Sequence, residues 1–156
     1  MPLFSLSLAF ALSLFIAAMG YSGYSAFSEK QDVDKAVFGV VKLRENIQRG
    51  YQGRTGYDGI STARVAALGL LPAEFSNGHG PLNTSLTISN AGGRQFNIVI
   101  GNLRAINNSQ LCTQLISSNR QAWQRRAVGS TVFTDDSIAD IQAACRNANQ
   151  VSLRSY

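Results

Sequence analysis

The sequence predicts an α+β fold that begins with a long helix, and three observations support this fold class. No charged residue precedes Glu29, and most of this opening stretch is apolar. The next twenty or so residues carry apolar side chains at the three- and four-residue spacing of an amphipathic helix. Further on, short stretches of alternating apolar and polar residues are typical of strands, and two segments place a cysteine on an apolar helical stripe.

The uncharged segment 3–27 is long enough to cross a bilayer as a helix, which requires about 20 residues. Apolar residues surround the helix on all sides, so it must be buried in lipid or in protein. A cleaved secretory signal is the alternative, but such signals begin with Lys or Arg and none precedes this run. We expect that a basic leader has been removed and that Met1 is the mature N-terminus. The stretch from Gly20 to Gly23 is a weak point of the helix, because glycine disfavours helical backbone.

The amphipathic pattern continues the same helix to residue 51. No proline or turn signal separates it from the apolar run, so we expect one helix with an apolar half and an amphipathic half. The predicted division is a hydrophobic segment 1–28 and a globular domain 29–156 that includes the amphipathic half. The residues expected to face the core of that domain are Val33, Val37, Val40, Leu43, Ile47 and Tyr51.

The segment after the helix is rich in turn signals. Glycines at 50, 53, 56 and 59 end the helix, and Ser61 is placed to cap a short helix that reaches about Leu70 and ends at Pro72. Residues 76–81 are expected to form a loop. A hairpin follows, with its turn at residues 90–93 and with alternating apolar residues in its strands: Leu86, Ile88, Phe96, Ile98 and Ile100.

The last third of the chain predicts two short helices and two strands. Asn108 or Ser109 is placed to cap the first helix, and Asp135 or Asp136 the second. One strand is expected near residues 130–133, although residues 121–134 are ambiguous, and a last strand carries Val151 and Leu153. The residues expected to face inward on the two helices are Leu111, Cys112, Leu115 and Ile116, then Ile138, Ile141, Ala144 and Cys145.

Cys112 and Cys145 are the two cysteines of the chain. A pair in a protein that crosses a membrane fits one disulfide formed in an oxidising compartment. Two buried free thiols are the alternative.

Catalytic chemistry has little support in the sequence. The single histidine, His79, lies in a glycine- and proline-rich loop, and no hydrolase, zinc or phosphate-loop motif occurs. Asp135, Asp136 and Asp140 could bind a metal, but acids also favour the first turn of a helix. We therefore predict that the protein is not an enzyme and has no cofactor.

A basic cluster with an aromatic residue lies at 120–126. The net charge is +5, and no acid occurs between Glu74 and Asp135. Arg120, Trp123, Arg125 and Arg126 could contact nucleic acid through phosphates and stacking. A solvated face or a contact between subunits is the alternative, and DNA as a partner is one hypothesis.

Three segments together resemble the type IVb pilins, a family that includes the major pilins of bundle-forming and toxin-coregulated pili and the pilins of conjugative thin pili. Residues 51–59 (YQGRTGYDG) are similar to the stretch that follows the long helix in bundle-forming pilins. Residues 109–115 (SQLCTQL) and 141–147 (IQAACRN) are similar to the two cysteine-bearing helices of the family. The resemblance covers nearly the whole chain and implies an α/β-roll, in which the long helix packs on an antiparallel sheet and one disulfide closes the C-terminal region.

The resemblance also implies a function. The chain would be a structural subunit, the major pilin of a type IVb pilus, cut by a prepilin peptidase and N-methylated at Met1. It would wait in the inner membrane until the assembly machinery adds it to an extracellular homopolymer that serves adhesion, aggregation or conjugative DNA transfer. The expected assembly residues of the apolar helix are Phe4, Ser5, Leu8, Phe10, Leu12, Phe15, Gly20 and Gly23.

Ser5 departs from the family pattern, which usually has glutamate at this position. A serine hydroxyl cannot neutralise the amine of Met1, and a buried unpaired ammonium is unfavourable. The amine would then bind hydroxyl or carbonyl acceptors or stay neutral, unless Ser5 only bonds to its own helix. This departure keeps an unusual or minor pilin open as an alternative. A second alternative concerns the apolar helix, which could be a simple anchor for a monomeric periplasmic binding domain.

Overall fold

The structure, a computed structural model, describes residues 28–104, 109–134 and 137–156. Residues 28–50 are helical, and residues 33–156 form one compact unit. Within the described ranges, no helix is both long enough and apolar enough to cross a membrane. The predicted apolar helix, its assembly residues and Met1 lie outside these ranges, so the predicted division at residue 28 stays a prediction.

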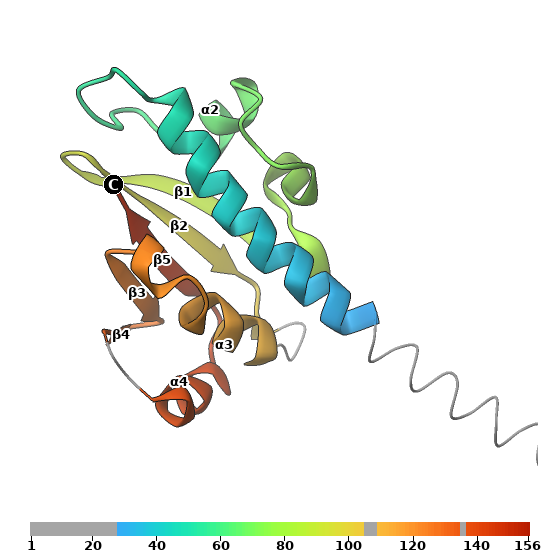
Figure 1. The fold of residues 1–156 in the computed structure, drawn as a ribbon. Coiled ribbons are helices and arrows are strands. Elements are labelled where there is room, and N and C mark those ends of the chain that lie inside the picture. Colours follow the sequence, from blue (N-terminus) through green and yellow to red (C-terminus); the bar gives the residue numbers. More distant parts are fainter. Residues whose placement is uncertain (1–27, 105–108, 135–136) are drawn as a thin grey trace, which may run out of the picture. The chain divides into compact units, whose positions relative to one another are not determined.

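An antiparallel sheet of five strands forms the centre of this unit (Figure 1). Its spatial order is β1-β2-β5-β3-β4, which places the last strand of the chain in the middle. All neighbouring strands are antiparallel. The bounds are Ser85–Gly92 for β1, Gln95–Gly101 for β2, Arg125–Val128 for β3, Thr131–Phe133 for β4 and Val151–Ser155 for β5.

The amphipathic helix covers one face of this sheet and buries its apolar stripe there (Figure 1). Leu43 and Ile47 are fully buried, and Val37 is the one predicted core residue of the helix that is only partly buried. On the sheet, alternate residues such as Phe96, Ile98 and Leu153 face the same core because successive strand residues point to opposite faces. The predicted helical periodicity is therefore confirmed, with Ala36 as an additional core residue.

The hairpin of β1 and β2 turns later than predicted. Asn90 and Gly92 remain in β1, and the pairing register shifts between them. The Asn90 side chain accepts a hydrogen bond from the Gly92 amide at 2.8 Å, which stabilises this irregular strand end. Gly92 and Gly93 have φ values of 93° and 59°, a left-handed backbone that glycine adopts without strain. The reversal therefore falls at Gly93 and Arg94.

Residues 61–84 connect the long helix to the sheet. Helix α2 (Thr62–Ala67) is capped as predicted, because the Ser61 hydroxyl accepts from the Arg64 amide, but it ends before Leu70. The predicted loop at 76–81 is instead largely 3-10 helix, in η1 (Ala73–Gly78) and η2 (Pro81–Asn83). Phe75 is completely buried, so this segment covers the core rather than extending into solvent.

Helices α3 (Ser109–Ser117) and α4 (Ile138–Cys145) pack against each other. The predicted inward stripe of α3 is confirmed, since its four residues are buried. In α4, Ile141 and Cys145 are buried, but the prediction is wrong for Ile138, which is 57% exposed. Ile138 is the first residue of the helix, and this first turn lies at the surface. Ser137 caps α4 by accepting from the Asp140 amide, whereas Asp135 and Asp136 lie outside the described residues.

Candidate assembly and binding surfaces

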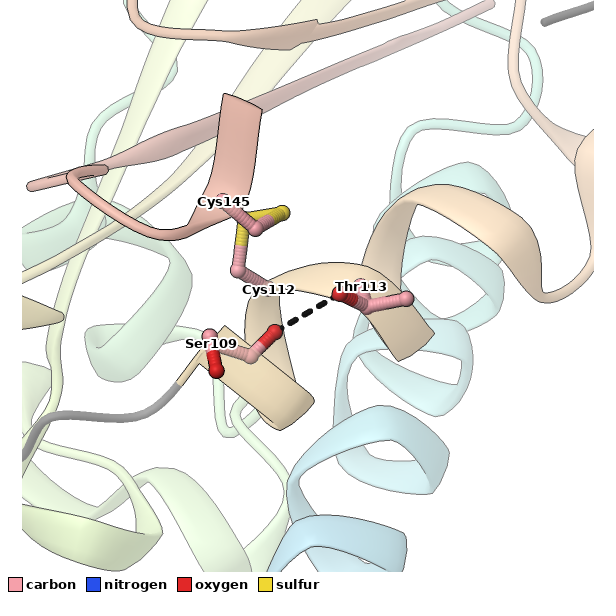
Figure 2. Close-up of a disulfide and its surroundings, with 4 residues drawn as sticks. All are labelled: Ser109, Cys112, Thr113 and Cys145. Atoms are coloured by element: carbon pink, nitrogen blue, oxygen red, sulfur yellow. Dashed lines mark hydrogen bonds between the residues drawn. A yellow bond between two sulfur atoms is a disulfide. The ribbon is translucent and has the colours of Figure 1, made fainter. Parts of the chain in front are cut away.

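A disulfide joins α3 to α4 through Cys112 and Cys145, which confirms the predicted pairing (Figure 2). The two Cα atoms are 5.6 Å apart, and the two cysteines are separated by 33 positions in the chain. Both are almost fully buried, so the bond lies within the core. Figure 2 also shows the Thr113 hydroxyl donating to the Ser109 carbonyl, a bond within the first turn of α3. The disulfide therefore links the two C-terminal helices covalently.

The basic cluster predicted at 120–126 does not form one surface. Arg120 and Arg125 are exposed, but Trp123 and Arg126 are buried, with 7% and 4% of their surfaces accessible. The prediction that Trp123 and Arg126 contact an external partner is therefore wrong for this conformation of the protein. DNA contact through Arg120 and Arg125 stays a prediction.

Trp123 is part of the contact between the long helix and the sheet. The guanidinium of Arg44 lies 5.7 Å from the centre of the indole ring, a cation–π distance. Arg44 also donates to the hydroxyl of Ser155 at 2.7 Å. The indole is thus covered by the protein itself and cannot stack on a base.

Arg126 acts as a buried connector between elements. Its guanidinium donates to the carbonyl of Ile116 at 2.6 Å and to the carbonyl of Thr134. Ile116 lies in the last turn of α3, where carbonyls have no partner within the helix and where positive charge is favourable. The strand register explains the burial, because Arg126 pairs with Leu153 and therefore shares its inward face.

The outward face of the sheet carries a basic pair that sequence reasoning missed. Arg154 lies directly across from Arg125 and donates to the side chain of Asn97 at 3.0 Å. The alternation of β5, with Val151 and Leu153 inward, was the signal that could have placed Arg154 outward.

The segment 51–59 forms an aromatic group at the end of the long helix. The ring centres of Tyr51 and Tyr57 are 5.3 Å apart, and those of Tyr57 and Phe96 are 4.7 Å apart. Burial raises the pKa of Tyr57 above its ordinary value of 10.0, and the positive charge of Arg44 partly offsets this effect. The two tyrosines singled out by the family resemblance thus have a structural role in anchoring the loop to the sheet.

No cluster with the geometry of a metal site occurs among the described residues, where no three His, Cys, Asp or Glu side chains come together. Asp140 accepts a hydrogen bond from the Ser137 hydroxyl at 2.6 Å, as expected of a helix cap. His79 lies in the 61–84 connection, where its backbone pairs with Ser85 and its amide donates to Ser76.

Comparison with known proteins gives the family. Residues 30–156 match the family model described as PilS N terminal. No curated protein matches the chain. The matched range covers the amphipathic helix, the sheet and the disulfide-linked helices, so the whole compact unit is included. The observed combination of helix, antiparallel sheet and one disulfide is consistent with an α+β pilin fold. The chain therefore belongs to the PilS N-terminal family and is a pilin-like protein of a type IV pilus.

Proposed function

We propose that the protein is the major pilin of a type IVb pilus and polymerises through its N-terminal helix into an extracellular filament. The family match carries this proposal, because it covers the compact unit and begins at residue 30, where the apolar run has just ended. The resemblance of residues 51–59 to bundle-forming pilins supports the IVb subtype.

The contrast between the amphipathic helix and the apolar segment before it supports a role in assembly. The amphipathic helix buries Val40, Leu43 and Ile47 against the sheet, so it belongs to the folded domain. The predicted apolar half, residues 3–27, carries no charged residue that could form a face exposed to water. Lipid and the interior of a helical filament are similar solvents for such a helix, so transfer between them need not expose it to water.

The proposed sequence of events begins with a prepilin peptidase that creates and methylates the N-terminus at Met1. The subunit then waits in the inner membrane with its disulfide-bonded domain on the periplasmic side. An assembly machinery adds it to the base of the filament, where it contacts other copies of itself. Adhesion, aggregation or conjugative DNA transfer is the proposed role of the filament outside the cell.

Protein sheared from the cell surface provides the test. We expect filaments by electron microscopy and an N-terminal peptide whose mass corresponds to N-methylated Met1. A mature start beyond residue 20 would mean that the apolar run is a cleaved signal, and the proposal would fail. A methylated chain that stays in the membrane fraction as a monomer would favour the anchored binding domain or a minor pilin.

A variant pair separates assembly from folding. Leu12→Arg places a charge in the middle of the apolar run, where it costs about 2.5–3.5 kcal/mol on insertion scales. Gln31→Arg adds the same charge at an exposed position of the helix. We expect the first variant to lose surface filaments and the second to retain them.

A further inference from the structure

The outward face of the sheet carries a row of polar side chains that crosses four strands. Three neighbouring pairs make up the row: Ser89 with Asn97, Asn97 with Arg154, and Arg154 with Arg125. The residues that follow them in β2 and β5, Ile98 and Leu153, face the core, so the row faces away from it. We call these four residues, Ser89, Asn97, Arg154 and Arg125, the basic row.

Two positive charges lie side by side in the basic row with no acid to balance them. Arg125 and Arg154 are directly opposite each other, which places their Cβ atoms about 4.5–5.5 Å apart. None of the five strands contains Asp or Glu, and the guanidinium of Arg125 has no partner among the described residues. Like charges in this arrangement destabilise a sheet, so the pair is unfavourable until an anion lies against it.

One of the two guanidinium groups is already held in place. The Nε of Arg154 donates to the side-chain oxygen of Asn97 at 3.0 Å, which limits the orientations of the guanidinium and leaves its terminal N–H groups for an external acceptor. Arg154 is half-buried, whereas Arg125 is exposed. A guanidinium binds phosphate through two parallel hydrogen bonds, so the row offers two such sites on adjacent strands.

The surface around the basic row is flat and has no aromatic residue. The outward positions beside the row carry small or short side chains: Ser85, Thr87, Val99, Ser152 and Ala127. The two aromatic residues of the strands, Phe96 and Phe133, are both buried in the core. The face therefore has nothing on which a base can stack, and a partner must be held along its charges.

We propose that the basic row binds the phosphate backbone of double-stranded DNA without reading its sequence. The row spans three spacings between strands, about 14 Å, and over that length one strand of a duplex carries about four phosphates. Guanidinium, amide and hydroxyl groups are the side-chain donors that contact phosphates in such complexes. Recognition of a single strand would require aromatic side chains, which this face lacks. The proposal names a partner for the proposed filament, but each subunit carries the complete row, so binding does not depend on polymerisation.

Fluorescence anisotropy with a labelled DNA duplex of mixed sequence tests the proposal, using the full chain in a non-ionic detergent. Affinity is measured between about 50 and 200 mM salt, because each phosphate contact contributes about 0.9 to the slope of log affinity against log salt concentration. We expect a slope of at least about 1.8 in magnitude, from one phosphate contact of each arginine. The same strand without its complement should not bind more tightly than the duplex.

Three variants assign the binding to the basic row. Arg125→Gln should weaken duplex binding about tenfold at low salt and reduce the slope by about 0.9, without lowering the thermal stability of the chain. Arg125→Lys retains the charge and should keep the slope while losing part of the affinity. Arg49→Gln is the matched control, because Arg49 is exposed on the helix that covers the other face of the sheet, and it should leave the slope unchanged.

Three outcomes would overturn the proposal. One is an equal loss of affinity in Arg125→Gln and Arg49→Gln, which would mean that only net charge attracts the duplex. Another is a clear preference for the single strand. The third is that heparin binds in an Arg125-dependent way while the duplex does not, which would identify an acidic polysaccharide as the partner. None of these results bears on Met1 methylation or on the formation of filaments, so the proposed function stands or fails separately.

Discussion

Replacing Arg126 tests whether this residue is a buried connector, as the structure indicates, or part of an exposed basic cluster, as the sequence predicted. Arg126→Met retains the apolar stem of the side chain but removes the two donors that reach the carbonyls of Ile116 and Thr134. The bond to Ile116 is buried, so its acceptor would lose its partner without access to water, at about 1–3 kcal/mol. The bond to Thr134 is partly buried, so water can replace the lost donor. Loss of this bond should therefore cost about 0.5–1.5 kcal/mol. We expect a total loss of about 1.5–4.5 kcal/mol in the free energy of unfolding.

Urea denaturation followed by tryptophan fluorescence measures this loss. Trp123 is the one tryptophan of the chain and is buried three positions from Arg126, so it reports on the same region. Arg125→Met is the matched control, since Arg125 is the preceding residue on the opposite, exposed face of β3. We expect the control to change stability by less than about 0.5 kcal/mol. Equal effects of the two substitutions, or no effect of Arg126→Met, would refute the connector role.

Three further predictions concern stability. Replacing both Cys112 and Cys145 by serine should lower the free energy of unfolding by about 3.5–4 kcal/mol from loop-closure entropy, and an unchanged urea midpoint would contradict this. Leu43→Ala should cost about 2–5 kcal/mol because Leu43 is fully buried, whereas Phe38→Ala on the exposed face of the same helix should cost little; thermal unfolding distinguishes the two. The raised pKa of Tyr57 means that the unfolded chain loses this proton first as the pH rises, so its contribution to stability should be lost progressively above about pH 10. Tyr57→Phe should make the urea midpoint less sensitive to pH in that range, and an unchanged pH dependence would rule out this role.

The elements with a clear period and an apolar face could be predicted from the sequence. The amphipathic helix repeats its apolar residues over six turns, and nearly all of them are buried as expected. The stripe of α3 and the alternation of β5 gave the same kind of signal. These predictions depend only on local spacing, which the sequence shows directly.

The errors occurred where burial depends on residues distant in sequence. Four residues of β3 contain two adjacent arginines, and nothing local indicates which of them faces inward. Arg126 is buried because carbonyls of α3 and of the segment after β4 lie within its reach. Ile138 was placed inward by its spacing from Ile141, but α4 begins at Ile138 and this first turn is exposed.

The aromatic group at the end of the long helix shows the same limit. The sequence singled out Tyr51 and Tyr57 through a family resemblance, but it did not connect them with Phe96 of the hairpin. That connection requires the close approach of Gly56 to Gly93, which only the packed hairpin reveals.

The order of the strands has a consequence for how the domain reaches its native state. Strand β5 is last in the chain but lies between β2 and β3, so it joins the hairpin β1–β2 to the hairpin β3–β4. Until β5 is in place, each hairpin has an open edge of unpaired backbone groups, which can pair with another chain. Contacts between segments so distant in sequence also form slowly, because a long loop must close first. A chain emerging N-terminus first therefore cannot complete its sheet until its final strand has emerged, and it is most vulnerable to aggregation just before that point.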